Sequence, residues 1–271
     1  MARRQGPIMP AGSVTAVRMM SGPDKPSGPR IVRRAPRAEG GRFSWAELRP
    51  TRLLQTLRAY FGLGRAAPPE PISSPAALQR FIDTRASFIA QTSLYGYLRT
   101  RAGMRYPELF DDDPFVAGIN IAKWHIWLDC VGDLAVFTGS RLARHSPQDT
   151  PRIATMMVDL LEGILSQAGT PDEAGREFPG HADQLRARVR DTDWLGVGDD
   201  AAAFSESPPS VVKWSPVMDE LKQLDEEIVL NSVRFRWQEV RRDFVRQLQP
   251  KSLLAALDGY PPAPGNSSLP R

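Results

Sequence analysis

The sequence predicts an all-α protein, an antiparallel helical bundle with a long C-terminal helix, preceded by a disordered basic N-terminal arm. Two observations support this fold class. Five pairs of a capping residue and a proline mark helix starts, because the cap oxygen accepts a free backbone N–H and proline fits the first helical turn. No stretch combines β-branched residues with the two-residue alternation of a strand. The pairs are Ser74-Pro75, Asp113-Pro114, Thr150-Pro151, Thr170-Pro171 and Ser215-Pro216.

Charge is unevenly distributed along the chain. Residues 1–72 carry 13 Lys and Arg against 4 Asp and Glu, whereas the whole chain of 271 residues has a formal net charge of +4. Residues 1–42 are rich in Pro, Gly, Arg and Ser without apolar periodicity, which favours disorder. We therefore expect an arm at 1–72, a helical-bundle domain at 73–258 and a disordered tail at 259–271.

The second part of the arm has a different pattern. Residues 43–63 place apolar side chains at three- and four-residue steps with arginines between them, which is typical of a basic amphipathic helix. Such a helix docks on a protein partner or lies on an anionic surface, such as a membrane or RNA. Loose packing on the bundle is the alternative. Arg49, Arg52 and Arg58 are its candidate binding residues.

Two long helices are expected to form the centre of the bundle. They span 74–103 and 113–144, with an acidic turn at 110–113 between them, and the second is apolar on nearly all sides. A third helix follows at 150–168. A weaker one at 170–193 carries a capping box at Thr170 and Glu173 and is split by Pro179. Residues 194–213 are expected to be irregular.

The last helix is expected at 215–248. Its apolar residues step by four, three and four, then by five, then again by four, three and four, which indicates a coiled-coil-like seam with a break in register. The seam predicts a homodimer through this helix. Arg241 and Arg242 are candidate binding residues in its basic second half. The seam residues are Val217, Leu221, Leu224, Ile228, Val233, Trp237, Val240 and Phe244.

Three polar residues of the second central helix share one face. His125, Asp129 and Asp133 are spaced by four residues, and with Arg85 they are the candidate catalytic residues. The alternative is that the aspartates form ion pairs with Arg85, Arg99 or Arg101, because an unpaired charge on an apolar helix is costly.

A mixture of aromatic and basic residues marks the end of the first central helix. Tyr95, Arg99, Arg101 and Arg105 are candidate binding residues for RNA or a phosphorylated ligand. The alternative is a set of solvated arginines near a helix C-terminus, where the helix dipole favours them.

Several classes of protein are excluded by the sequence. The single cysteine, Cys130, permits no disulfide within the chain, and no run of residues is apolar enough to span a membrane. No Walker loop, dinucleotide-binding motif or metal-ligand spacing occurs, so no cofactor or metal is predicted. We expect a cytoplasmic protein that is at most peripheral to a membrane.

Residues 81–110 (FIDTRASFIAQTSLYGYLRTRAGMRYPELF) and 112–133 resemble a family of uncharacterised alphaproteobacterial all-helical proteins, some of which are labelled esterases. The resemblance covers the two central helices and implies a bacterial origin. It supplies no catalytic residues to carry over, and the chain has no Gly-x-Ser-x-Gly nucleophile motif.

The sequence therefore favours a non-enzymatic helical interaction or assembly protein whose basic arm contacts an anionic surface or a larger complex. A small-molecule hydrolase with a polar site between the central helices is the alternative. A polar pocket around His125 would favour the hydrolase, whereas a dry core with paired charges would favour the interaction protein.

Overall fold

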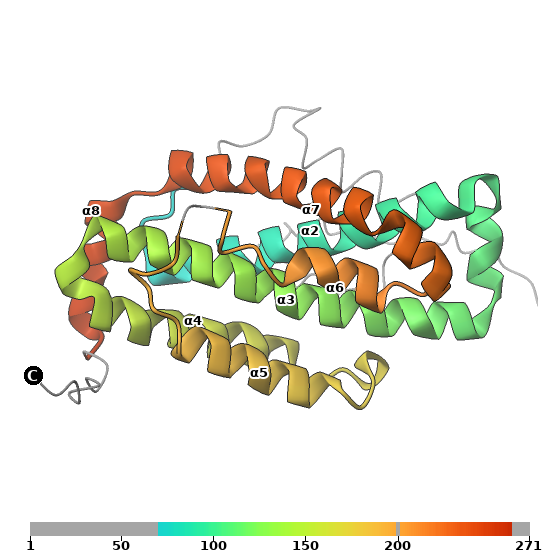
Figure 1. The fold of residues 1–271 in the computed structure, drawn as a ribbon. Helices are drawn as coiled ribbons and strands as arrows, with labels where there is room; N and C mark the ends of the chain where they lie inside the picture. Colours follow the sequence, from blue (N-terminus) through green and yellow to red (C-terminus); the bar gives the residue numbers. More distant parts are fainter. Residues whose placement is uncertain (1–69, 199–200, 262–271) are drawn as a thin grey trace, which may run out of the picture. The chain divides into compact units, whose positions relative to one another are not determined.

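The computed structural model describes residues 70–198 and 201–261. The expected amphipathic helix at 43–63, with Arg49, Arg52 and Arg58, lies outside the described residues, as does most of the expected tail. In the described ranges the protein is all-α, with seven packed α-helices and no β-strand (Figure 1), which confirms the predicted fold class. None of the helices in these ranges combines the length and apolarity needed to cross a membrane.

Three of the connections between helices contain 3₁₀ turns, and a fourth 3₁₀ turn follows the last described helix. The α-helices are α2 (Pro75–Ala102), α3 (Asp113–His145), α4 (Thr150–Ala168), α5 (Phe178–Arg190), α6 (Ser207–Trp214), α7 (Asp219–Gln247) and α8 (Pro250–Ala255). The 3₁₀ turns are η2 (Gly103–Asp111), η3 (Pro147–Asp149), η4 (Asp172–Ala174) and η5 (Ala256–Gly259).

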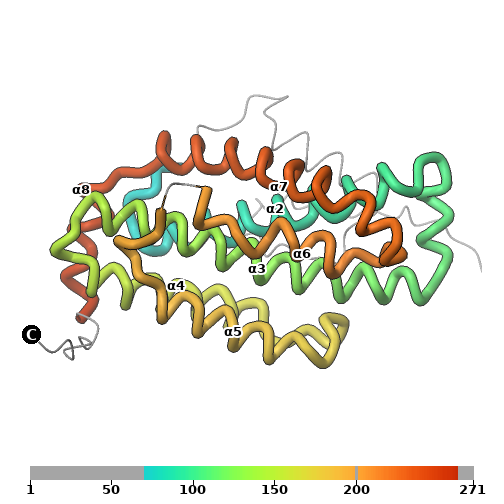
Figure 2. Tube along the Cα trace, viewed as in Figure 1, coloured from blue at the N-terminus to red at the C-terminus, as the bar shows by residue number. Residues whose placement is uncertain are grey.

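Helix α3 lies at the centre, as its apolar sequence predicts. It packs against α2, α4, α5 and α6, and every residue from 130 to 140 is buried. Figure 2 shows α7 on one side of α3 and the pair α4 and α5 on the other. A helix that is apolar all round can satisfy its surface only by being surrounded in this way.

A cluster of aromatic rings attaches α7 to this centre. Phe244 of α7 packs against Phe81 of α2 and Phe137 of α3, with ring centroids 5.6 Å apart in both pairs. Trp237 packs on Phe204 at 4.6 Å. Because each buried large apolar side chain contributes about 1.5–3 kcal/mol, this cluster holds one face of α7 firmly on the bundle.

Three of the five capping-residue and proline pairs mark helix starts. Helices α2, α3 and α4 begin at or next to Ser74, Asp113 and Thr150, with a proline in the first turn of each. Only Ser74 acts as a side-chain cap, since its Oγ accepts the N–H of Ala77 at 3.3 Å. At the other two starts the side chain makes no capping bond, so the proline is the effective signal.

The other two pairs do not start helices. Thr170-Pro171 precedes only η4, and Glu173 does not complete a capping box because its carboxylate binds Lys123 and Trp124 of α3. The Ser215 hydroxyl donates to the carbonyl of Val211 at 2.6 Å, so it belongs to the end of α6. Helix α7 therefore begins four residues later than expected, at Asp219.

Two predictions about proline were also wrong. Pro179 does not split a helix but lies in the first turn of α5. Pro208 and Pro209 lie in the first turn of α6, inside the stretch that was expected to be irregular. Proline is tolerated at these positions because the first backbone N–H groups of a helix have no partner within the helix.

The first described residues are attached to the end of α7. Ile72 is buried, its N–H donates to the Gln247 carbonyl at 2.9 Å, and its carbonyl accepts the Gln249 N–H at 3.0 Å. These bonds form an isolated parallel bridge between Ile72 and Leu248. Ile72 therefore lies beside the C-terminal end of α7.

Candidate functional site

A chain of three hydrogen-bonded polar side chains lies between α3 and α5. Asp129 Oδ1 is 2.9 Å from His181 Nε2, and His181 Nδ1 is 2.7 Å from His125 Nδ1. The four-residue spacing puts His125 and Asp129 on one face of α3, as the sequence predicts. The third member, His181, comes from α5.

The hydrogen bonds allow one arrangement of protons when both imidazole rings are neutral and Asp129 is a carboxylate. His181 donates its Nε2 proton to the Asp129 carboxylate, so its Nδ1 has a lone pair. His125 must then donate from Nδ1, which leaves Nε2 of His125 without a proton. This Nε2 atom is buried and has no hydrogen-bond partner among the described residues. The chain therefore ends in the buried imidazole of His125, close to the backbone of Ala174.

Aromatic rings enclose that nitrogen. Trp214 of α6 stacks on His125 with ring centroids 3.7 Å apart, and Phe178 of α5 packs edge-on at 6.1 Å. The His125 side chain is 0% exposed. Burial, with a smaller contribution from neighbouring His181, lowers the pKa of His125 to about 4. His125 is therefore neutral at pH 7, and its ring is closed off from solvent.

Asp133 does not belong to the hydrogen-bonded chain of His125, His181 and Asp129, and it has other partners. Its carboxylate lies 2.8 Å from Arg188 Nη2 of α5 and accepts the backbone N–H groups of Glu206 and Ser207 at 3.2 and 2.8 Å. It thus caps the first turn of α6 from a neighbouring helix, where the helix dipole favours a negative charge. Burial raises the pKa of Asp133 to about 6, although Arg188 and Ser207 act against this rise.

A glycine allows α5 to approach α3 closely at this point. A Cβ atom on Gly132 would lie 2.6 Å from Leu185 Cδ1 and 3.0 Å from Arg188 Nη1. The absence of a side chain at residue 132 therefore lets Arg188 reach the neighbouring Asp133.

The remaining candidate catalytic residue, Arg85, lies elsewhere. It pairs with Asp243 of α7 at 3.0 Å, and burial lowers its pKa. The expected pairing of Asp129 and Asp133 with Arg85, Arg99 or Arg101 was therefore wrong in its partners. The partners are His181 and Arg188, while Arg101 binds Asp225 at 3.1 Å.

The candidate binding residues near the end of α2 are spread over separate contacts. Tyr95 is half-buried, and burial raises its pKa to about 12. Arg105 pairs with Glu108 at 3.2 Å, and Arg99 is exposed near the C-terminus of α2. Arg101 and Arg105 are thus each paired with a carboxylate, and the binding role of this set stays a prediction.

An ion pair between a buried lysine and an exposed glutamate was also not expected from the sequence. Lys123 of α3 is only 4% exposed and binds Glu173 at 2.7 Å, and Trp124 Nε1 donates to the same carboxylate at 3.0 Å. Burial alone raises the pKa of Glu173, but the hydrogen bonds from Lys123 and Trp124 outweigh it, so the pKa is lowered. This pair attaches the η4 turn to the centre of the bundle.

The described residues offer no evident metal centre. Within residues 70–198 and 201–261, no group of three or more His, Cys, Asp or Glu side chains is arranged to hold a metal ion. The nitrogens of His125 and His181 bind each other instead of converging on a common point.

Helix α7 presents a second candidate site, on its outer surface. Leu224, Ile228, Phe235 and Val245 are 76%, 72%, 71% and 51% exposed. With the exposed polar residues Asn231, Gln238 and Arg242 they form one row, which steps by four and three residues and is called the outer row below. Val233, Trp237, Val240 and Phe244 are buried on the opposite side.

The expected seam of α7 thus divides between two faces. Its five-residue step turns the helix by about 500°, or about 140° beyond one full turn. Ile228 and Val233 consequently point to different sides. Leu224 and Ile228 belong to the outer row, whereas the residues from Val233 onward pack on the bundle.

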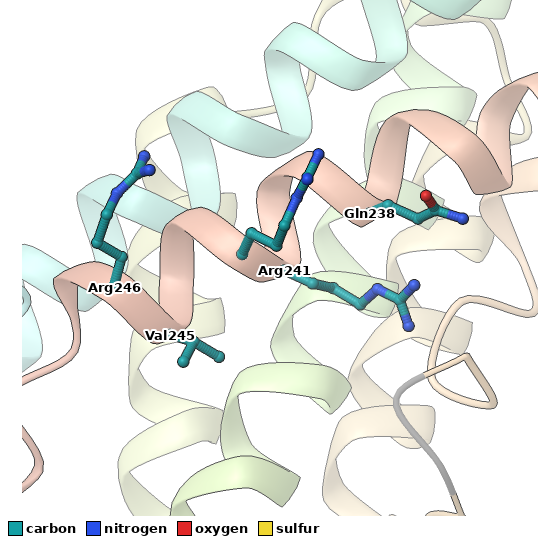
Figure 3. Close-up of a pocket in the computed structure, with 5 residues that line it drawn as sticks. Gln238, Arg241, Val245 and Arg246 are labelled. Atoms are coloured by element: carbon teal, nitrogen blue, oxygen red, sulfur yellow. The ribbon is translucent and has the colours of Figure 1, made fainter.

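A basic groove of about 530 Å³ runs along the second half of α7. Its described lining consists of Gln238, Arg241, Arg242, Val245 and Arg246. Figure 3 shows that Arg246 and Val245 point to different sides of the helix, so the side chains do not converge as in an enclosed ligand pocket. Arg241 also lies over the Phe204 ring at 5.9 Å.

Sequence reasoning missed His181, Arg188 and Trp214, which complete the interior polar sites. His181 is one of only 3 histidines in the chain, which was the one available signal. Arg188 lies among other arginines of α5, and nothing in the sequence distinguishes it.

Comparison with models of known protein families, with curated proteins and with solved structures finds no match to this chain.

Proposed function

We propose that this protein is a non-enzymatic helical interaction protein that binds its partner through the outer row of α7. One observation carries the proposal: four large apolar side chains at coiled-coil spacing face solvent on a helix whose other face is fixed to the bundle. Large apolar side chains exposed along one face of a helix, when its other face packs on the protein, are typical of an interaction site.

The interior supports an interaction protein rather than an enzyme. Several of its charged groups form ion pairs: Asp133 with Arg188, Arg85 with Asp243, and Lys123 with Glu173. Paired charges hold neighbouring helices in one arrangement. This is the pattern expected of a scaffold.

The proposal is tested by co-purification of the full-length protein from its source cells. In the test variant, Leu224→Ser, Ile228→Ser and Phe235→Ser are combined. All three side chains are exposed, so the fold should be retained. Met104→Ser is the matched control, because Met104 is 97% exposed but lies in η2.

The wild-type protein and the control should retain the same bound protein, including any differently tagged copy of this chain. The triple variant should lose at least about 90% of it, which corresponds to more than about 1.4 kcal/mol of binding free energy. Equal recovery by the triple variant would refute the proposal.

A hydrolase is the second candidate, and the chain Asp129–His181–His125 is the observation that favours it. A carboxylate that orients an imidazole supplies two of the three groups of a catalytic triad. The third group is a nucleophile, and Nε2 of His125 binds no hydroxyl or thiol among the described residues. We expect the wild-type protein to hydrolyse short-chain nitrophenyl esters no faster than a His125→Phe variant. A clear wild-type excess would favour the hydrolase.

The basic arm contributes to the proposed function as an electrostatic tether. Its excess of positive charge would attract an anionic surface or complex, and such attraction weakens steeply with salt. The arm would then bring the protein to its site of action, while α7 provides the specific contact.

A further inference from the structure

We propose that two copies of this chain pair antiparallel through the outer rows of their α7 helices. This inference rests on the proposed function, because it names the partner of the same surface. It is carried by the charges that flank the outer row, which are arranged to suit a second copy running in the opposite direction.

Four charged residues flank one side of the outer row. Glu220, Glu227, Arg234 and Arg241 recur every seven residues, and the last three directly precede Ile228, Phe235 and Arg242. In a coiled coil the residues at this position control which helices pair and in which direction. Along α7 they change from two acids to two arginines.

An antiparallel pair brings opposite charges together. In this arrangement the flanking residues of one helix face the same kind of position on the other. When Leu224 of one copy packs against Phe235 of the other, Glu227 lies opposite Arg234 and Glu220 lies opposite Arg241. Two-fold symmetry repeats both pairs, as is usual for homodimers.

A parallel pair is disfavoured by the same residues. Each flanking residue would then face the residue five positions further along the second helix. Glu220 would face Asp225, and Arg241 would face Arg246. Only the central contact, between Arg234 and Glu239, would join opposite charges. The flanking charges therefore favour the antiparallel arrangement over the parallel one.

The bundle is already suited to such a dimer. The inner face of α7 stays packed on the bundle through Val233, Trp237, Val240 and Phe244, so pairing requires no rearrangement of the core. The basic groove beside Arg241 and Arg242 lies where the first turn of the second copy would come, with its Glu220. The position of the basic groove and the flanking charges thus favour the same partner, a second copy of this chain.

The test is sedimentation equilibrium of the full-length protein, with three charge variants. Glu227→Arg and Arg234→Glu each place like charges opposite one another in the dimer, and combining them restores opposite charges. Glu227 and Arg234 are both exposed, so the variants should fold as the wild type does. Thermal unfolding followed by circular dichroism verifies this.

We expect the wild-type protein to dimerise reversibly, with a dissociation constant below about 100 μM. Each single charge reversal should raise that constant about 10-fold or more, and the double variant should return to within about 3-fold of wild type. A wild-type monomer at all concentrations would overturn the inference, and so would a double variant that associates no better than the single variants.

This result is separable from the test of the proposed function. A monomeric wild-type protein would exclude the second copy as partner. Co-purification of a different protein, lost in the triple outer-row variant, would still support α7 as an interaction surface. A monomeric wild-type protein, together with equal co-purification by the triple variant, would refute both proposals.

Discussion

His125 couples the folding of this protein to pH through its buried ring. In the folded state its pKa is lowered to about 4, whereas a histidine in the unfolded chain titrates near 6.5. The folded protein therefore binds this proton less readily than the unfolded chain does. The stability that His125 provides is complete above pH 6.5 and is lost as the pH falls toward 4.

A His125→Phe variant should remove this dependence, since phenylalanine keeps an aromatic ring against Trp214 but cannot be protonated. Between pH 6.5 and pH 4, the free energy of unfolding of the wild type should fall by about 2–3 kcal/mol more than that of the variant. Urea unfolding at several pH values measures the difference.

Asp133 changes stability in the opposite direction. Because its pKa is raised to about 6, the folded state favours the protonated carboxyl, and the stability that protonation provides is lost as the pH rises through 6. Both proteins of the comparison contain Asp133, so the difference between them isolates His125. Parallel stability curves would show that His125 does not titrate in this window.

Asp133 should also matter for stability at neutral pH. Asp133→Ala leaves Arg188 and two backbone N–H groups of the first turn of α6 without their acceptor. We expect a loss of about 3 kcal/mol in the free energy of unfolding, because removing one partner of a buried ion pair costs about 3–5 kcal/mol.

Asp133→Asn is the matched control, since its side-chain oxygen can still accept one of these N–H groups. It should lose clearly less stability than the alanine variant in the same urea experiment. Equal losses would mean that the size of the side chain, and not its role as acceptor, determines stability at this position.

At the residue scale, the sequence could predict which polar residues share a face but not their partners. The spacing of His125, Asp129 and Asp133 is a property of one helix and can be read locally. Their partners lie 52 and 55 residues away for Asp129 and Asp133, and the packing of α5 selects them. That packing depends on Gly132, whose role no local pattern indicates.

At the scale of elements, close contacts at glycine determine how tightly the helices and loops pack on α3. Gly139→Ala would place a Cβ atom 2.2 Å from Trp194 Cζ3 and 3.0 Å from Met157 Cγ. The rigid indole ring has little room to move, so we expect a loss of about 1–3 kcal/mol in the free energy of unfolding.

Gly180→Ala provides the comparison, because a Cβ atom there would meet nothing within 4 Å and the residue lies in the first turn of α5. This change should be neutral or should stabilise by up to about 1 kcal/mol. Chemical unfolding of both variants distinguishes the two sites. Similar values for the two would contradict close packing at Gly139.

The elements themselves differ in how far the sequence could predict them. Helices α2, α3 and α4 have long apolar patterns and prolines in their first turns, so their predicted ends lie within a residue or two of the observed ones. Helices α5 and α6 also start with prolines, but their prolines were interpreted as breaks. Proline occurs both in the first turn of a helix and just after a helix ends, so a local pattern does not distinguish the two cases.

The seam of α7 shows a similar limit. Its register break was recognised from the five-residue step, but a sequence cannot say which half faces the bundle. The aromatic contacts of Phe244 and Trp237 decide this. The first half of the seam is consequently left in solvent, where it forms part of the outer row.

At the scale of the whole molecule, the uneven charge predicts salt-dependent binding by the arm. We expect full-length protein to co-sediment with anionic vesicles or with RNA at low salt, and to be released as salt rises. Replacing Arg49, Arg52 and Arg58 together by Gln should weaken this binding markedly, since each basic residue near an anionic membrane surface contributes about 1 kcal/mol.

The control carries Gln at three exposed arginines of the bundle, Arg80, Arg176 and Arg190, so that both variants lose the same charge. Its binding should remain closer to that of the wild type. If the two variants are equally weakened, net charge and not the arm is responsible. The ligand that the wild type prefers identifies the class of surface.

The bridge between Ile72 and Leu248 gives the protein a defined mechanical path. Tension applied to the residues before Ile72 would reach the end of α7 first, through the hydrogen bonds to Gln247 and Gln249. A protein anchored by its arm and joined to a partner through α7 could therefore pass load between the two along one edge of the bundle.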